Sequence, residues 1–150
     1  MPNKRFAVVV SRFNDVVTER LLAGARACFT DHGYQDADVA VFSVPGAWEL
    51  PIAALHAARN GFAGVVAIGC VVRGDTPHFD YVAGGAAEGL ARVSVETGVP
   101  VAFGVLTTED MDQALDRAGG KHGNKGYEAA LTALEMVDLI GRMQEESAST

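Results

Sequence analysis

A three-layer α/β/α sandwich built on a four-stranded parallel sheet is the fold that this sequence predicts. Short apolar runs rich in β-branched residues alternate along the chain with longer segments of helical periodicity. Strands that alternate with helices pair in parallel through right-handed crossovers, which places helices on both faces of the sheet. The 150 residues have the length of one domain and show neither an internal repeat nor a linker, so we expect a single domain over residues 1–150.

The individual elements follow from this alternation. The apolar runs short enough to be buried strands are Phe6–Val10, Val39–Val44, Val65–Ile68 and Val101–Leu106. Helices are expected from Thr18 to His32, from Glu49 to Asn60, from about Phe79 to Thr97, from Met111 to Arg117, and after Gly126 through Ile140. The expected arrangement is flavodoxin-like, with residues 1–5 and 145–150 frayed.

The net charge and the residue composition exclude several classes of binding partner. The formal net charge of −7 argues against nucleic acid and against an anionic membrane, since both require a basic face. No apolar stretch approaches the length that spans a membrane, and the first apolar run is too short for a signal peptide. The two cysteines, Cys28 and Cys70, form no CxxC pair, and the histidine spacings suit no metal site. We therefore expect a reduced, cytoplasmic setting and no bound metal.

The segment Gly69–Val82 carries the densest group of chemically useful side chains. It joins a buried strand to a helix, and ligands of open α/β sheets bind at the carboxyl ends of strands. Asp75 and Thr76 precede a helix N-terminus, which attracts phosphate, although Thr76 could be only a helix cap. His78, at the start of that helix, can pass a proton near pH 7; a capping or buried histidine is the alternative.

The loops after the other strands should meet the same crevice, because parallel strands end at one edge of a sheet. Phe13 and Trp48 could stack on a planar ring, or could be core aromatics. Glu49 could accept hydrogen bonds from hydroxyls or amides, or could be an ordinary first-turn acid. Thr107 and Thr108 complete the expected crevice.

The glycine-rich segment Gly119–Gly126 has no P-loop ending, and the first strand is not followed by GxGxxG. Nucleotide hydrolysis and dinucleotide binding are thus disfavoured. Lys125 could form an imine, stand beside a phosphate or carbonyl as a cation, or be solvated. The sequence is also more apolar than a solitary domain needs, at 49% hydrophobic residues, which favours an oligomer.

Five motifs, in order, resemble the 6,7-dimethyl-8-ribityllumazine synthase family over Phe6–Met143. The motifs are Ser11–Asn14, Val44–Pro51, Val72–Val82, Phe103–Thr108 and Arg117–Gly126. The resemblance implies condensation of 5-amino-6-ribitylaminouracil with 3,4-dihydroxy-2-butanone 4-phosphate in riboflavin biosynthesis, with release of phosphate and water. It implies no metal or redox cofactor.

The resemblance also implies roles for particular residues and for the assembly. His78 matches the proton-transfer residue, and the butanone phosphate is held at Asp75, Thr76 and Arg117. The ribitylaminouracil is held at Phe13, Ala47, Trp48, Glu49, Cys70, Val71, Val72, Phe103 and Lys125. Phe103 reaches the site from a neighbouring subunit of a pentamer, a pair of pentamers or a sixty-subunit shell. Riboflavin synthase is a candidate partner.

Two features depart from the family pattern. Many relatives begin with an extra strand that pairs with an adjacent subunit, whereas only five residues precede Phe6 here. Asp75 places an acid where a small residue is common, beside the expected phosphate. Two alternatives are a flavin- or lumazine-binding protein without turnover and a structural shell protein, although neither needs phosphate-binding and proton-transfer residues together.

Overall fold

The computed structural model of the chain describes residues 4–149 and contains one parallel four-stranded sheet. Its strands are β1 (Phe6–Ser11), β2 (Val39–Val44), β3 (Gly64–Val72) and β4 (Val101–Thr108), in the order β2-β1-β3-β4. Each neighbouring pair runs parallel. This order is the flavodoxin-like arrangement, and the predicted fold class is confirmed.

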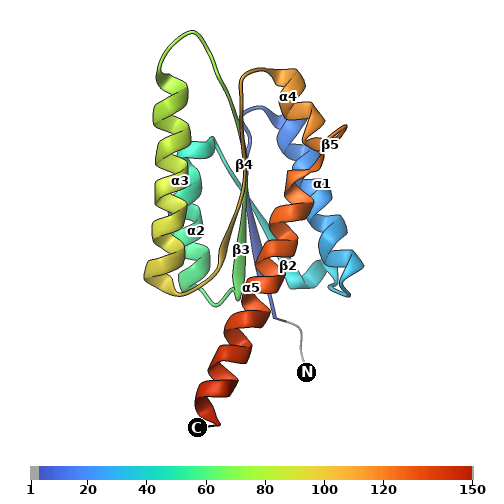
Figure 1. Cartoon of the computed structure of the whole chain (residues 1–150), viewed down its shortest axis with the longest axis vertical. Coiled ribbons are helices and arrows are strands. Elements are labelled where there is room, and N and C mark those ends of the chain that lie inside the picture. Colours follow the sequence, from blue (N-terminus) through green and yellow to red (C-terminus); the bar gives the residue numbers. More distant parts are fainter. Residues whose placement is uncertain (1–3, 150) are drawn as a thin grey trace.

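Helices cover both faces of the sheet (Figure 1). One face carries α1 (Asp15–Asp31), α4 (Met111–Asp116) and α5 (Lys125–Ala148). The other carries α2 (Leu50–Arg59) and α3 (His78–Thr97). Two short 3₁₀ turns, η1 (Asp36–Asp38) and η2 (Ala47–Glu49), precede β2 and α2, and a small antiparallel hairpin of β5 (Ala118–Gly120) and β6 (Gly123–Asn124) precedes α5.

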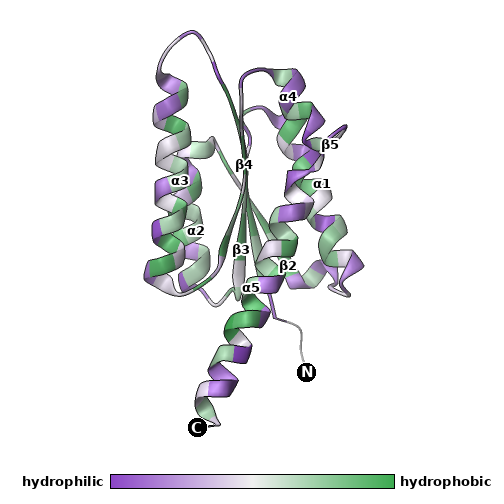
Figure 2. Cartoon of the chain, viewed as in Figure 1, coloured by the Kyte–Doolittle hydropathy of each residue, from purple (hydrophilic) through white to green (hydrophobic). Residues whose placement is uncertain are grey.

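The core has two parts because the central strands are buried on both faces. Val66 and Ile68 of β3 pack toward α1 and α5, whereas Val65 and Ala67 pack toward α2 and α3. Burial on both sides explains why β3 is a continuous apolar run rather than an alternating one. Figure 2 shows the same distribution, with hydrophobic strands between helices that are mixed in character.

Several boundaries differ from the expected ones, each for a local reason. Helix α1 begins at Asp15, a turn before Thr18, because Asn14 with φ of 64° ends the preceding turn. Strand β3 continues to Val72 because its last residues pair with β4 up to Thr108. The short helix α4 begins at Met111, as expected, and is capped by Asp110, whose Oδ1 accepts a hydrogen bond from the N–H of Gln113 at 2.8 Å.

The two ends of the chain also differ from expectation. Helix α5 continues to Ala148, so the prediction that residues 145–150 are frayed is wrong for 145–148. At the other end, the Arg5 carbonyl accepts a hydrogen bond from the N–H of Ala63 at 2.8 Å. Residues 1–3 and Thr150 lie outside the described residues. Among the helices that the structure describes, none is long and apolar enough to cross a membrane.

Candidate active site

One pocket lies where the loops after β1 and β3 diverge toward opposite faces of the sheet. Helix α1, after β1, covers one face, and α3, after β3, covers the other, so this is the topological switch point of the sheet. We call it the switch-point pocket. It is lined by Phe13, Pro45, Gly46, Ala47, Trp48, Glu49, His78, Tyr81 and Val82, and continues along Cys70, Val71, Val72, Gly74, Thr76 and Phe79.

A backbone hydrogen bond and a side-chain hydrogen bond hold the loops of the switch-point pocket together. The N–H of Phe13 donates to the carbonyl of Pro45 at 3.1 Å, which joins the loop after β1 to the loop after β2. The side-chain amide of Asn14 donates to the carbonyl of Cys70 at 3.0 Å, which joins it to the end of β3. Three loops that are distant in the sequence therefore form one wall.

The aromatic side chains of this pocket are exposed. Phe13 is 70% exposed and Trp48 is 61% exposed, so the alternative that either is a core aromatic is wrong. The Trp48 ring lies directly against α3 at Gly85, where a Cβ atom would overlap the ring. Both rings are thus available to a planar ligand. Trp48 can take this orientation because residue 85 of α3 is a glycine, which has no side chain to displace the ring.

Glu49 of η2 and His78 of α3 line the same pocket. The Glu49 Oε1 accepts a hydrogen bond from the N–H of Gly46 at 3.0 Å, so this carboxylate both closes the 3₁₀ turn and lines the pocket. His78 is the first residue of α3 and is exposed, which excludes a buried histidine. Its N–H lies 3.4 Å from Thr76 Oγ1, so Thr76 makes only a long capping contact.

The end of β3 carries no reactive side chain toward the switch-point pocket. Cys70 is buried, and burial raises the pKa of its thiol to about 11. The thiol therefore stays protonated near neutral pH and is a poor nucleophile. Val71 and Val72 line the pocket beside it.

A second pocket, which we call the edge pocket, lies along β4, one of the two edge strands of the sheet. It is lined by Phe103, Val105, Leu106, Thr107, Thr108, Gln113, Arg117, His122, Lys125 and Glu128. Arg117 and Lys125 are adjacent because the N–H of Lys125 donates to the Arg117 carbonyl at 2.8 Å. Guanidinium, ammonium and imidazole groups here make an environment suited to an anion.

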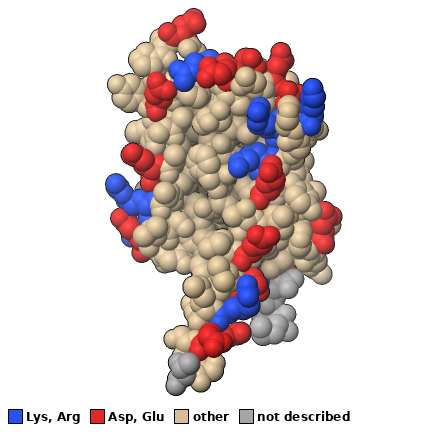
Figure 3. Space-filling model, viewed as in Figure 1, with Lys and Arg blue, Asp and Glu red and all other residues tan. Residues whose placement is uncertain are grey.

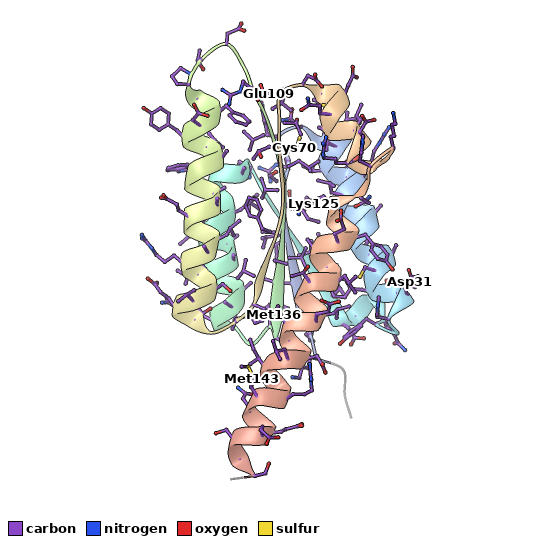
Figure 4. All side chains as sticks on the ribbon, viewed as in Figure 1. Asp31, Cys70, Glu109, Lys125, Met136 and Met143 are labelled. Atoms are coloured by element: carbon purple, nitrogen blue, oxygen red, sulfur yellow. The ribbon has the colours of Figure 1, made fainter. Side chains whose placement is uncertain are left out.

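The edge pocket shares no lining residue with the switch-point pocket, so the expectation of a single crevice is wrong. The reason is the path of the chain beyond the strands. The chain leaves β3 over the α3 face, whereas it leaves β4 toward α4 on the opposite face (Figure 1). Thr107 and Thr108 therefore belong with Arg117, away from Trp48. Figure 4 places Lys125 at the start of α5, beside the sheet, below Cys70 and Glu109.

Some lining residues were missed by sequence reasoning. Tyr81 lies three positions after His78 in α3 and so shares its helix face, a spacing that could have identified it. Gln113 and Glu128 carry no comparable signal. Among residues 4–149, no group of three or more His, Cys, Asp and Glu side chains is placed to hold a metal ion.

Arg73, in the loop between β3 and α3, is engaged by acids. Its Nε lies 2.9 Å from a Glu109 carboxylate oxygen and another guanidinium nitrogen lies 3.6 Å from Asp80. The guanidinium also lies 4.5 Å from the centre of the Phe79 ring. Arg73 thus braces the loop that holds Asp75 and Thr76, and Figure 3 shows acidic and basic groups mixed at this upper end.

Fold and pockets together define a flavodoxin-like α/β protein with an aromatic pocket at its switch point and a pocket with cationic side chains along one sheet edge. The family model for 6,7-dimethyl-8-ribityllumazine synthase matches residues 3–141. A protein of that name from Chlorobium luteolum is 51% identical over 140 residues, 93% of this chain and 90% of the relative. Those from Chlorobium phaeobacteroides and Chlorobium limicola are 53% and 52% identical over 136 residues, 90% of this chain and 88% of each relative. The chain belongs to the 6,7-dimethyl-8-ribityllumazine synthase family.

Proposed function

We propose that this chain condenses 5-amino-6-ribitylaminouracil with 3,4-dihydroxy-2-butanone 4-phosphate to give 6,7-dimethyl-8-ribityllumazine. Membership of the family makes it an enzyme, a transferase of riboflavin biosynthesis, with small-molecule substrates and an oligomeric assembly. The observation that carries the proposal is the pairing of an aromatic pocket beside His78 with a cationic pocket around Arg117. The first suits a pyrimidine and the second suits a phosphate.

The complete active site contains the switch-point pocket of one copy and the edge pocket of the next. Phe13, Ala47, Trp48 and Glu49, with the backbone of residues 70–72, hold the pyrimidine and its ribityl chain. Phe103 and Lys125 of the adjacent copy close over it. The butanone phosphate lies between the amides at Asp75 and Thr76 and the guanidinium of the adjacent copy's Arg117. The separation of the two pockets within one chain supports this division.

The condensation then needs positioning and proton transfer. The 5-amino nitrogen attacks the ketone carbon and water leaves, which forms an imine. Loss of a proton beside the imine and departure of phosphate leave an enol, which becomes a carbonyl. The ribityl-bearing nitrogen attacks that carbonyl, the ring closes and a second water leaves. His78 moves the protons, and holding two reactive substrates together supplies much of the acceleration.

Product formation tests the activity directly. The purified protein is mixed with both substrates, and lumazine fluorescence is followed together with released phosphate. We expect one phosphate for each lumazine. A protein that only binds flavins or lumazines, or that only builds a shell, forms no product from the two substrates, and that result overturns the proposal.

Complementation tests whether each site is shared. His78→Ala damages one pocket and Arg117→Ala damages the other, so each variant alone is slow at low butanone phosphate. In randomly co-assembled oligomers, a head-to-tail contact leaves about one site in four with both pockets intact. Activity above the sum of the separate variants supports a shared site. Activity equal to that sum overturns the sharing and leaves the reaction itself standing.

Native mass tests the assembly, which we propose to be a pentamer or a sixty-subunit shell of pentamers. With a chain of 15.7 kDa, light scattering gives about 79 kDa for five copies and about 942 kDa for sixty. A stable, active monomer contradicts a site shared between copies. We further propose a cytoplasmic location, with riboflavin synthase as a candidate partner because it would consume the product.

A further inference from the structure

The segment that carries Arg117 and Lys125 is fastened to helix α1 by one side chain, Asn124. The Asn124 Nδ2 donates to the carbonyl oxygen of Arg20 at 3.0 Å, a contact between residues 104 positions apart. Its Oδ1 accepts from the N–H of Tyr127 at 3.0 Å and so caps α5. A single amide therefore starts one helix and binds it to another.

Two glycines make this contact possible by letting α1 and α5 approach closely. A Cβ atom at Gly24 of α1 would overlap the amide group of Asn124, and one at Gly126 of α5 would overlap the Leu21 carbonyl. The space that a side chain would fill is thus taken by the Asn124 amide and by the backbone of the facing helix. The position of α5 against α1 is fixed by contact rather than by a flexible side chain.

The residues of the edge pocket depend on this fastening. Asn124 pairs with Ala118 across the small hairpin, and Lys125, the next residue, bonds through its N–H to the Arg117 carbonyl. Asn124 itself does not line the edge pocket. It therefore acts on Arg117 and Lys125 through the backbone, without contact to a ligand.

Helix α1 connects this segment to the other pocket. The start of α1 is held at the switch-point pocket by Asn14, whose side-chain amide donates to the Cys70 carbonyl. The second turn of α1 contains Arg20, whose carbonyl accepts the hydrogen bond from Asn124. One helix thus fixes the spacing between the two pockets of a chain. In a closed assembly, a shift of one pocket relative to the other is repeated at every site.

We infer that Asn124 is a positioning residue that holds Arg117 and Lys125 where their cationic groups can bind the phosphate of the substrate. The inference rests on the proposed function. It predicts that the interhelical bond, and not only the helix cap, determines the affinity for butanone phosphate.

Asn124→Ser separates the two roles, since serine caps a helix about as well as asparagine but does not reach the Arg20 carbonyl. Steady-state kinetics should show a KM for butanone phosphate raised by about tenfold, with kcat at saturation nearly unchanged. The matched control is Asn60→Ser: Asn60 donates to the His56 carbonyl at 2.6 Å at the end of α2, away from both pockets. A purely structural Asn124 would lower Tm in Asn124→Ser and leave this KM unchanged, which overturns the inference.

Gly24→Ala tests the same contact between Asn124 and α1 by a change in α1. Its new methyl group displaces the Asn124 amide, so it should also raise the KM for butanone phosphate. In the Asn124→Ala background that amide is absent, and Gly24→Ala should add little. Independent, additive effects on this KM show that the two residues do not act together and overturn the inference.

Arg117→Ala separates failure of the inference from failure of the proposed function. If Arg117→Ala leaves the KM for butanone phosphate unchanged, the proposed phosphate site falls, and the inference falls with it. If Arg117→Ala raises this KM and Asn124→Ser does not, the inference alone falls.

Discussion

The switch-point pocket and the edge pocket differ both in chemistry and in how they are held. The switch-point pocket is walled by exposed aromatic rings, with one histidine and one carboxylate at its rim. The edge pocket is polar and carries the cationic groups of Arg117 and Lys125. Neither alone contains the groups that a condensation with loss of phosphate requires.

The difference in support is equally marked. Three strand ends meet at the switch-point pocket, where the Phe13 N–H bonds to the Pro45 carbonyl and the Asn14 side-chain amide bonds to the Cys70 carbonyl. The edge pocket borders a single free strand and is held from behind by α4, α5 and the small hairpin. Figure 3 shows few charged side chains in the middle of the face between α3 and α5, beside this edge. The loops that follow three strands and the start of α3 therefore form one pocket, whereas a single strand and the segments packed against it form the other.

The largest effect should come from removing the proton carrier of the switch-point pocket. His78→Ala is expected to lower kcat by about 10²–10⁴-fold, and no more, because positioning of the two substrates is retained. Stopped-flow and steady-state assays of lumazine formation measure this. Full activity with both substrates bound normally would show that His78 does not transfer the proton, and the contrast between the pockets would then be one of binding alone.

A smaller and more selective effect should come from the edge pocket. Arg117→Ala removes a charge-assisted contact and is expected to raise the KM for butanone phosphate by about 10- to 100-fold, with little change in the KM for the pyrimidine. Varying each substrate in turn separates the two constants. An equal rise in both would mean that Arg117 supports the assembly rather than the phosphate.

A still smaller effect is expected at the contact between Trp48 and α3. Gly85→Ala places a methyl group where the Trp48 ring now lies, so the ring must move and the KM for the pyrimidine should rise by about three- to tenfold. Gly84→Ala is the matched control, because a Cβ at Gly84 meets nothing within 4 Å. Gly84→Ala should leave this KM unchanged and slightly stabilise the helix. If both variants bind the pyrimidine alike, the placement of Trp48 is unimportant.

The sequence alone was sufficient to predict the four strands, the main helices and the parallel pairing of the strands, because these depend on the local pattern of apolar residues. Apolar runs such as Phe6–Val10 and Val101–Leu106 lie in strands, and the alternation with helices predicts parallel order. The position of His78 at a helix start also follows from the loop after a strand, whereas the exposure of Phe13 and Trp48 was left open by the sequence and is seen only in the structure. These residues are close in the sequence to the strands that carry them.

What could not be predicted depends on distant parts of the chain. Periodicity does not say which face of the sheet a helix covers, so the division into two pockets was not visible in Thr107 or Arg117. The bond between Asn124 and Arg20 joins residues 104 positions apart, and the space at Gly24 appears only once α5 is in place.

A last prediction compares two buried thiols as pH rises, that of Cys70, which lines the switch-point pocket, and that of Cys28 in α1. Burial raises the pKa of Cys70, and burial together with Asp31 raises that of Cys28, each from 9.0 to about 11. Both thiols thus hold their protons longer in the folded chain than in the unfolded one. This contribution to the free energy of unfolding is fully present below pH 9 and is lost as pH rises toward 11. Each thiol should contribute about 2 kcal/mol or less. Urea unfolding at increasing pH should therefore show a shallower loss of stability in Cys70→Ala than in the parent chain. An unchanged slope would mean that water reaches the Cys70 thiol in the folded chain.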